Sequence, residues 1–400
     1  MNKPKIRFKG FEGEWKERKF GDFGHVEMCK RIFKYQTSSQ GEIPFYKIGT
    51  FGFQPDAFIS RSLYEDYRKK FSYPKKGDIL ISAAGTIGRT IEYKGEECYY
   101  QDSNIVWLNH NEEIDNAYLK QLYSLVTWSS LEGATIKRLY NSNILNTHFN
   151  LPSLPEQRAL ASYFTSLDAQ IAASTSRLSS LKQIKAASLL NMFPQKGETV
   201  PRVRFKGFQG EWKEVKLSSI AIFSKGQGYS KSDLRENGHP IILYGRMYTK
   251  YQFAINEVDT FSNLKGAYVL SEGNEIIMPA SGETSEDIAC ASAVLAKGII
   301  LGGDLNIVRF DLKKYSTPFL ALTITYSKTH YDLSKCAQGK SVVHLHNEAI
   351  SKTVVSIPSL PEQRAIASYF TALDAQITLQ RERLEKLKQI KAACLEKMFA

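Results

Sequence analysis

Three short segments carry residue types that could perform chemistry, and each lacks a required member. The segment Gly339-Lys340-Ser341 ends like a phosphate-binding loop, but Ser334 stands where such a loop needs its first glycine. His344 and His346 could share one face of a strand and bind a metal ion, yet no third ligand has a suitable spacing. The segment 281–284, Ser-Gly-Glu-Thr, is not a Gly-x-Ser-x-Gly nucleophile elbow. We therefore predict no catalytic residue and no metal site in this chain.

The charge balance indicates binding instead of catalysis. The 400 residues include 53 Lys and Arg against 41 Asp and Glu, which gives a net charge of +12. Such an excess favours a polyanionic partner, with nucleic acid first and an anionic membrane surface second. Basic side chains would position the protein on phosphates, and Asn, Gln, Ser, Thr and Arg would reach base edges. Turns that follow strands are the natural places for these contacts.

Two regions supply the candidate contacts to nucleic acid. In the first region they surround a Gly-rich turn and a basic stretch: Ser82, Thr86, Arg89, Lys137, Arg138 and Asn141. In the second they begin in the flexible segment 225–231, which we favour most: Lys225, Gln227, Tyr229, Ser230, Lys231, Tyr244, Arg246, Tyr248, Lys250, Ser281, Thr284, Lys340 and His344. Each has a structural alternative, because a Gly-rich turn can be only a turn and alternating tyrosines are typical of a half-buried strand.

The chain repeats itself, and the repeat decides its architecture. Residues 6–17 recur at 203–214 as x-Arg-Phe-Lys-Gly-Phe-x-Gly-Glu-Trp-Lys-Glu, and residues 151–171 recur at 357–377. About 30 of the 43 positions from 151 to 193 are identical in the second copy, which indicates a tandem duplication of a unit of about 200 residues. The inserts between the repeated ends, at about 20–132 and 217–338, have diverged far more. Trp15 and Trp212, inside the repeated leaders, are interpreted as core anchors.

Each repeat ends in a long predicted helix. Pro155 and Pro361 lie where the helices begin, with Glu and Gln in the first turn. Apolar residues then recur at alternating steps of three and four: Phe164, Leu167, Ile171, Leu178 and Leu181 in the first helix, and Phe370, Leu373, Ile377, Leu384 and Leu387 in the second. A period near 3.5 over about five heptads without internal Gly or Pro is typical of a coiled-coil seam. The simplest arrangement packs the two helices on each other.

These features predict an α+β protein with an internal pseudo-two-fold repeat. The expected segments are a leader (1–19), a first globular α/β domain (20–150), a first helix (151–195), a second leader (196–216), a second globular domain (217–356) and a second helix (357–400). A basic protein with two globular parts and a helical rod has the geometry of a dimeric DNA reader fused into one chain. Because the two inserts differ, the predicted target is split and asymmetric.

The repeated motifs resemble those of the specificity (S) subunits of type I restriction–modification systems. The resemblance lies in Leu154-Pro-Glu-Gln-Arg158 and its copy 360–364, in the two Arg-Phe-x-Gly-Phe-x-Gly-x-Trp leaders, and in the segment 77–88 of the first insert. It covers the whole chain in the family's order. It implies that each insert is a target-recognition domain for double-stranded DNA and that the helices form an antiparallel coiled coil. That coiled coil would set the spacer between the half-sites and dock two methyltransferase (modification) subunits, which restriction/translocase subunits join.

The resemblance also implies that this chain has no catalysis of its own and no cofactor. The chain contains no Asn-Pro-Pro-Tyr-like motif and no Gly-rich AdoMet loop, so AdoMet, ATP and Mg are expected in partner subunits. Five scattered cysteines read as reduced thiols, and the N-terminal segment is not a signal peptide, which together favour a cytoplasmic location without a membrane partner. Two alternatives stay open: a coiled-coil protein-binding adaptor and a stand-alone nucleic-acid-processing enzyme.

Overall fold

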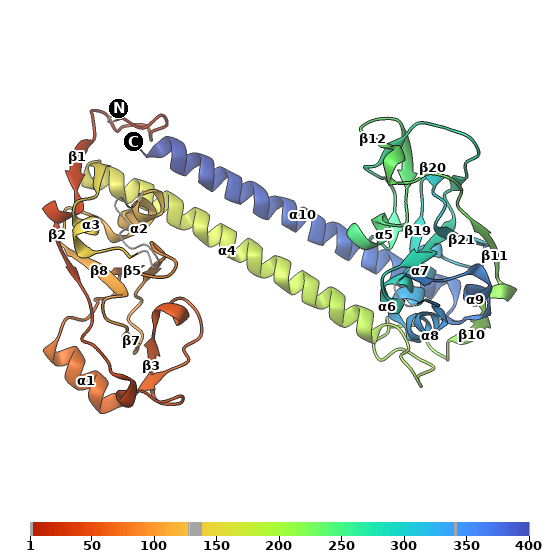
Figure 1. Cartoon of the computed structure of the whole chain (residues 1–400), viewed down its shortest axis with the longest axis horizontal. Coiled ribbons are helices and arrows are strands. Elements are labelled where there is room, and N and C mark those ends of the chain that lie inside the picture. Colours follow the sequence, from red (N-terminus) through yellow and green to blue (C-terminus); the bar gives the residue numbers. More distant parts are fainter. Residues whose placement is uncertain (1–2, 127, 129–137, 340–341, 400) are drawn as a thin grey trace. The chain divides into compact units, whose positions relative to one another are not determined.

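The computed structural model describes residues 3–126, 128, 138–339 and 342–399. It divides into two compact units, of which the first contains Met1–Thr175 and Glu382–Ala400 and the second contains Ser176–Arg381. Each unit therefore holds one globular part together with one end of each long helix. Those helices are α4 (Leu154–Asn191) and α10 (Leu360–Met398), and they are labelled with the other elements in Figure 1.

The first unit is built on a four-stranded antiparallel sheet and also contains two smaller sheets. Its strands are β1 (Lys16–Lys19), β2 (Gly24–Glu27), β3 (Ile43–Tyr46), β4 (Phe58–Ile59), β5 (Ile79–Ser82), β6 (Thr90–Glu92), β7 (Tyr99–Tyr100), β8 (Ile105–His110) and β9 (His148–Leu151), and its short helices are α1 (Arg61–Lys70), α2 (Asn116–Leu125) and α3 (Asn141–Leu145). The order β2-β8-β5-β6 forms the central sheet, β4-β3-β7 forms a second one, and β1 pairs with β9. The β1–β9 ribbon ties the leader to the start of α4.

The second unit repeats this plan with additions. Its strands are β10 (Lys213–Lys216), β11 (Ala221–Lys225), β12 (Leu234–Arg235), β13 (His239–Ile242), β14 (Ala254–Ile255), β15 (Phe261–Ser262), β16 (Leu270–Glu272), β17 (Glu275–Pro279), β18 (Ser281–Gly282), β19 (Ser292–Val294), β20 (Lys297–Leu301), β21 (Leu305–Phe310), β22 (Val343–His344) and β23 (Val354–Ile357). Its helices are α5 (Arg246–Thr249), α6 (Ser285–Ile288), α7 (Thr317–Tyr326), α8 (Lys328–Cys336) and α9 (Asn347–Lys352). The order β11-β21-β17-β19-β14 corresponds to β2-β8-β5-β6 of the first unit, and β10 pairs with β23 as β1 does with β9.

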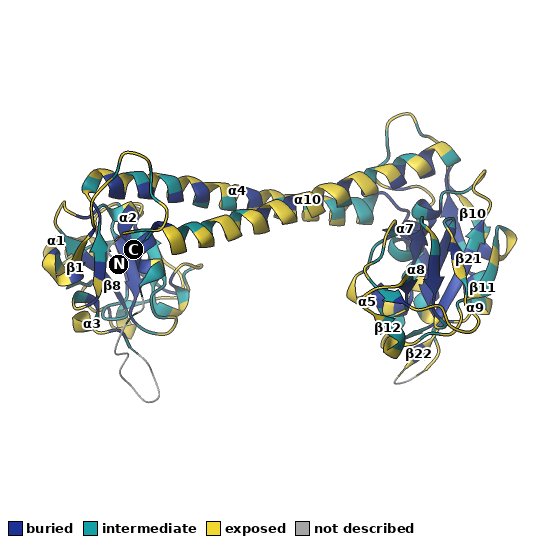
Figure 2. Cartoon of the chain, turned by 90° about the horizontal axis from the view of Figure 1, so that it is seen from above, coloured by how far each residue is buried: buried dark blue, intermediate teal, exposed yellow. Residues whose placement is uncertain are grey.

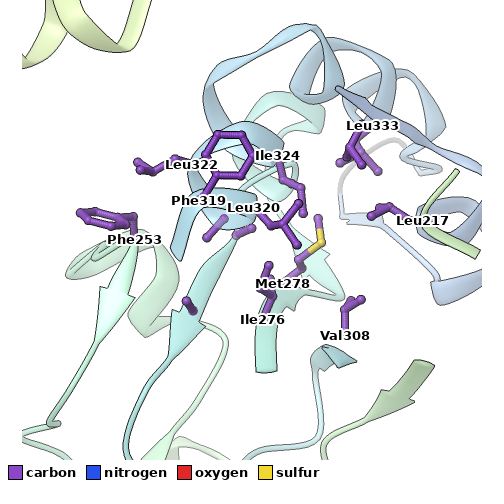
Figure 3. Close-up of a cluster of buried hydrophobic side chains, with 14 of the residues drawn as sticks. Leu217, Phe253, Ile276, Met278, Val308, Phe319, Leu320, Leu322, Ile324 and Leu333 are labelled. Carbon is purple, nitrogen blue, oxygen red and sulfur yellow. The ribbon is translucent and has the colours of Figure 1, made fainter. Parts of the chain in front are cut away.

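Both faces of each central sheet are buried. Successive side chains of a strand point to opposite faces, and in these strands each face meets its own apolar cluster. In the first unit, Ile79 and Ile81 of β5 face one apolar cluster and Leu80 faces another. In the second unit, Ile276 and Met278 of β17 face one cluster and Ile277 faces another. Figure 3 shows how Ile276, Met278 and Val308 point toward the side chains of α7. The continuous apolar runs in these strands follow from this double burial.

The leaders are fixed to the cores as predicted. Trp15 and Trp212 are 2% and 3% exposed, which confirms their interpretation as core anchors. Trp15 meets the ring of Phe399 edge-on at 6.3 Å in the first unit, and Trp212 meets Phe193 at the same distance in the second. In both units, the phenylalanine just after the end of a long helix therefore packs against the tryptophan of the leader.

Within each unit the two long helices pack antiparallel. In the first unit Asp168 of α4 forms an ion pair with Lys391 of α10 at 2.5 Å, and in the second unit Lys185 of α4 pairs with Asp374 of α10 at the same distance. A second contact in each unit gives the direction, since Tyr163 meets Cys394 in the first unit and Ser188 meets Tyr369 in the second. Within each unit, partner numbers thus fall on one helix as they rise on the other, so the packing expected from the resemblance is present in both. The predicted seam residues are buried or half-buried, and exposed residues separate them along both helices (Figure 2).

Candidate nucleic-acid interface

The Gly-rich turn after β5 forms a compact structure around one buried hydroxyl. Ser82 is 1% exposed, and its Oγ donates to the carbonyl of Thr86 at 2.5 Å and accepts from the backbone N–H of Arg89 at 2.9 Å. Gly85 and Gly88 have φ angles of +64° and +81°, which favour glycine and let the turn close. Ser82 therefore shapes the turn and offers no free group to nucleic acid, in contrast to the predicted contact.

The other predicted residues of this turn remain accessible to different degrees. Thr86 is exposed, whereas Arg89 is half-buried, donates to the carbonyl of Phe51 at 2.9 Å and lies 5.0 Å from the centre of the Phe53 ring. These residues line a cavity of about 220 Å³ together with Ile48 and Gly49. Only part of the Arg89 guanidinium is thus available for an outside partner.

A larger cavity in the same unit gathers basic and amide groups. Its volume is about 630 Å³, and its lining includes Arg31, Lys34, Lys47, Gln101 and Arg138. Arg31 pairs with Asp102 at 2.8 Å, and Arg138 donates to the carbonyl of Ser103 at 2.9 Å. Among the residues that the structure describes, Lys34 has no acidic partner. This is the pattern expected of a surface that meets phosphates and base edges.

Of these lining residues, only Arg138 was predicted from the sequence. Asn141, also predicted, is exposed at the first position of α3, and Lys137 lies outside the described residues. The loop that precedes β3 was missed, because it contains no Gly-rich signature. Its alternation of basic and aromatic residues from Lys30 to Tyr35 could have indicated it.

The segment 225–231, which we favoured in the second unit, follows β11 as the missed loop follows β2. Lys225, Gln227, Ser230 and Lys231 are exposed there, as a contact surface requires. Tyr229 is different, because its hydroxyl accepts from the backbone N–H of Lys265 at 3.0 Å and the Lys265 ammonium lies 5.4 Å from its ring centre. The hydrogen bond from Lys265 also lowers the pKa of Asp233 to about 2.

Two predicted residues of the second unit, Arg246 and Lys250, are bound to the same aspartate. Arg246 is 9% exposed, and its guanidinium bonds to Asp259 and to Gln252, so it supports the fold and is not free for DNA. Lys250 shares the same aspartate at 2.5 Å. Hydrogen bonds from Lys250 and then Arg246 hold the pKa of the Asp259 carboxyl well below its usual range.

Three other predicted residues of the second unit, Tyr244, Tyr248 and Ser281, line one cavity. Tyr244, Tyr248 and Ser281 line a hollow of about 1010 Å³ together with acidic side chains of α6 and its N-terminal flank. Tyr248 donates to the carbonyl of Ser281 at 2.7 Å, and burial raises its pKa. The Ser281 Oγ lies 3.2 Å from Nδ1 of His344, whose ring stacks on His346 at 6.2 Å.

Of two further predicted residues, Thr284 has a role inside the fold and Lys340 is not among the residues that the structure describes. The hydroxyl of Thr284 accepts the N–H of Asp287 at 3.0 Å and thereby caps α6. Lys340 lies outside the described residues. No group of three His, Cys, Asp or Glu side chains among the described residues is placed to hold a metal ion, and none of the described helices is long and apolar enough to cross a membrane.

The repeated Pro-Glu-Gln-Arg motif forms the same clamp in both units. Glu156, buried at the start of α4, accepts two hydrogen bonds from the Arg7 guanidinium at 2.6 and 2.7 Å, and Glu362 accepts the same pair from Arg204. The hydrogen bond to Glu156 raises the pKa of Arg7. The motif's glutamate therefore holds the leader on the helix.

The other two residues of the motif behave differently from each other. Gln157 accepts from the N–H of Asp115 at 3.0 Å and so ties the helix to the loop before α2, and Gln363 does the same with Ser316. Arg158 and Arg364, in contrast, are exposed, and neither forms an ion pair with any described residue. An identical arginine without an internal role in both copies is typical of a surface that binds something else.

Comparisons with known proteins agree on one family. Residues 12–183 and 209–389 both match the family described as the type I restriction modification DNA specificity domain. A protein of Haemophilus influenzae named as a type I restriction enzyme specificity subunit is 56% identical over 143 residues, which are 36% of this chain and only 37% of that relative. A type I restriction enzyme specificity subunit of Methanocaldococcus jannaschii is 18% identical over 324 residues, 79% of this chain and 73% of that protein.

The fold has a counterpart among solved structures. The crystal structure of a type I restriction-modification system S subunit from M. genitalium superposes with a TM-score of 0.61 at 15% sequence identity, and the match covers 100% of this chain and 99% of that one. At this identity the likeness concerns the fold. It extends over both repeats and both long helices.

Proposed function

Since the chain belongs to the family of type I restriction modification DNA specificity domains, we propose that it is the DNA specificity subunit of a type I restriction–modification complex. The observation that carries the proposal is the duplicated scaffold. Both units have the same central sheet, the same leader clamp and the same helix start, whereas the loops around the sheets differ. A constant frame with two unlike basic surfaces suits a non-catalytic reader of two unlike DNA half-sites.

Each globular part would read one half of a split, asymmetric site. In the first unit the surface around Arg31, Lys34 and Arg138 supports this role, and in the second unit the exposed segment 225–231 does. Basic residues would hold the duplex by its phosphates, and amide and hydroxyl groups would meet base edges. The paired helices between the two globular parts would set the length of the unread spacer.

The exposed faces of the long helices would dock two methyltransferase subunits. Arg158 is followed on the same face of α4 by Ser162, Thr165 and Ala169, all exposed, and the same four residue types are exposed on α10 from Arg364 to Ala375. The middle of the helices, in contrast, has diverged between the copies. Two matching faces support two copies of one partner.

The other partners and the cofactors would belong to the assembled complex. Restriction/translocase subunits would join the methyltransferases, and AdoMet, ATP and Mg would bind in these partner subunits. We expect the complex to act in the cytoplasm on double-stranded DNA.

The decisive experiment is to produce the chain together with a methyltransferase encoded nearby and to map methylated bases across the genome. A two-part asymmetric motif with a fixed spacer, and a purified complex with two methyltransferases per chain, are expected. Methylation without such a motif would contradict the proposal. A stable complex without any DNA affinity would identify a protein-binding adaptor, and AdoMet turnover by the isolated chain would identify a stand-alone enzyme.

The docking faces can be tested separately. An Arg158→Glu variant and an Arg364→Glu variant should each lose one of the two methyltransferases, because each reverses the charge of one face only. Native mass spectrometry of the purified complexes would measure the stoichiometry. Arg381→Glu is the matched control, since Arg381 is exposed on the same helix where the other copy has Thr175. A full complement of methyltransferases in both face variants would contradict this assignment.

A further inference from the structure

Two aromatic side chains project from the loop that follows β2. Phe33 and Tyr35 are 49% and 83% exposed, and their rings stack on each other with centres 5.7 Å apart and planes 8° apart. The loop is held in shape by the short 3-10 helix η2 (Lys34–Gln36), in which the side chain of Gln36 accepts from the N–H of Phe33 at 2.9 Å. The pair is therefore presented on an ordered turn.

Packing within the unit does not account for this exposure. Phe53 and Phe71, which are also exposed, each lie 5.0 Å from a cation, provided by Arg89 and Lys30 respectively. The rings of Phe33 and Tyr35 stack on each other, and most of the Tyr35 side chain remains exposed. A contiguous exposed aromatic surface is typical of a binding site, since leaving it in water costs free energy.

The chemistry around the pair points to DNA. Lys34 lies between the two aromatic residues in the chain and lines the 630 Å³ cavity with Arg31, Lys47 and Arg138. Arg31 and Lys47 form ion pairs with Asp102 and Asp56 of the same cavity, which leaves an excess of two basic groups, Lys34 and Arg138. Phe33 lines a neighbouring cavity with Lys30 and Arg31. Cations would hold the phosphates on both sides while the rings meet the apolar faces of bases. A net basic excess around so small an apolar surface favours a polyanionic partner over a protein partner.

We propose that Phe33 and Tyr35 form a wedge that enters a base-pair step of the first half-site and unstacks it. The inference rests on the proposed function and adds a mode of recognition to it. Side chains that enter a base step kink the duplex, and the energy of the kink depends on the sequence of that step. The first unit thus reads deformability as well as base edges.

The corresponding loop of the second unit carries no such stacked pair among its described residues. The loop after β11 also ends in a 3-10 turn, η5 (Lys231–Asp233), but its aromatic residue is Tyr229. Tyr229 is fixed by its hydrogen bond to the backbone of Lys265, and the ammonium of that lysine covers its ring. The two half-sites are therefore recognised differently, with unstacking confined to the first.

The test uses the full chain in complex with its methyltransferase and a duplex that carries the mapped site. A 2-aminopurine is placed at each position of the first half-site in turn, and its fluorescence reports unstacking. The unaltered complex should raise the fluorescence at one step. The Phe33→Ala/Tyr35→Ala variant should lose this signal and bind roughly 10- to 100-fold more weakly, which is the range for loss of stacking on one base.

Salt dependence separates stacking from phosphate contact. The double variant should keep the slope of log K against log salt, whereas Lys34→Ala should reduce the slope by about 1 and keep the fluorescence signal. Tyr35→Trp should retain both the signal and the affinity because it restores a stacking ring. Tyr331→Ala, which removes an exposed tyrosine from α8, is the control and should change nothing.

The outcomes distinguish this inference from the function on which it rests. If the double variant binds the mapped site as tightly as the unaltered complex with the same fluorescence, the wedge is overturned and the specificity function stands. If Tyr35→Trp loses the fluorescence signal and the affinity although the complex is folded and assembled, the proposed stacking is wrong as well. If the unaltered complex shows no site-specific binding, the proposed function itself fails.

Discussion

At the scale of single residues, the duplicated motif separates structural from outward-facing roles. The pairs Arg7–Glu156 and Arg204–Glu362 have the same nitrogen–oxygen distances, although the two copies have diverged elsewhere. The carboxylates are almost fully buried, so each needs its guanidinium. Two residues of the motif are thus identical in both copies for different reasons. Glu156 makes a contact inside the unit, whereas Arg158 faces outward.

Removal of one arginine should therefore be costly. Arg7→Ala leaves Glu156 buried without its partner and should lower the free energy of unfolding of the first unit by about 3 kcal/mol. Urea denaturation followed by circular dichroism measures the change. Arg61→Ala is the control, because Arg61 and Glu97 form an exposed pair whose loss should cost far less stability. Equal effects of the two substitutions would contradict the clamp.

The buried hydroxyl of Ser82 gives a second prediction at this scale. Ser82→Ala removes the donor to Thr86 and the acceptor for the N–H of Arg89 and should cost about 1–2 kcal/mol of stability. The methylated motif should remain unchanged, because this side chain does not reach the surface. A changed first half-site in the methylation map would restore Ser82 as a base contact.

At the scale of elements, the heptad seam determines the helix pair. Leu373 is 6% exposed and Leu379, on the same helix, is 68% exposed. Polar residues also occupy the seam, and both Ser174 and Gln380 are buried there. The reciprocal ion pairs of Asp168 and Asp374 with Lys391 and Lys185 flank the apolar positions and match the antiparallel direction.

Substitutions at these two leucines should differ in effect. Leu373→Ala creates a cavity at the seam and should reduce the free energy of unfolding by about 2–3 kcal/mol. Leu379→Ala removes the same atoms from an exposed position and should change it by less than about 0.5 kcal/mol. Thermal unfolding of the full chain provides both values. A large effect at Leu379 would indicate that the exposed face is covered by another part of the molecule.

At the scale of the whole molecule, each unit has its own apolar core and its own surface loops. The clusters of the first unit contain no residue from 165 to 391, and those of the second contain none outside 189–370 among the described residues. The units can therefore diverge independently, because a change in one core does not disturb the packing of the other.

This independence predicts the result of a domain exchange. Replacement of residues 20–150 by the corresponding segment of another family member should change one half of the methylated motif and leave the other half intact. The exchange extends to residue 150 because Ile144 and Phe149 belong to the core beneath α4. Genome-wide mapping of methylated bases measures the outcome. A motif changed in both halves would contradict separate reading by the two units.

The sequence by itself determined the duplication, the α+β class, the two long helices with their seams, and the anchoring role of Trp15 and Trp212. These features are local or periodic, so a pattern along the chain is enough to reveal them. The equivalence of the two central sheets could also be foreseen, because Ile79–Gly85 is echoed by Ile276–Gly282 in the strands β5 and β17.

Only the tertiary structure decided which loop side chains are free to meet a partner. Ser82 and Arg246 appear in sequence as polar groups on turns, but contacts within the fold occupy them. Tyr229 is fixed by Lys265, 36 residues away in the chain, whereas Phe33 and Tyr35 are left exposed. Such contacts join residues distant in sequence, and their formation depends on packing of the whole unit, which no local pattern encodes.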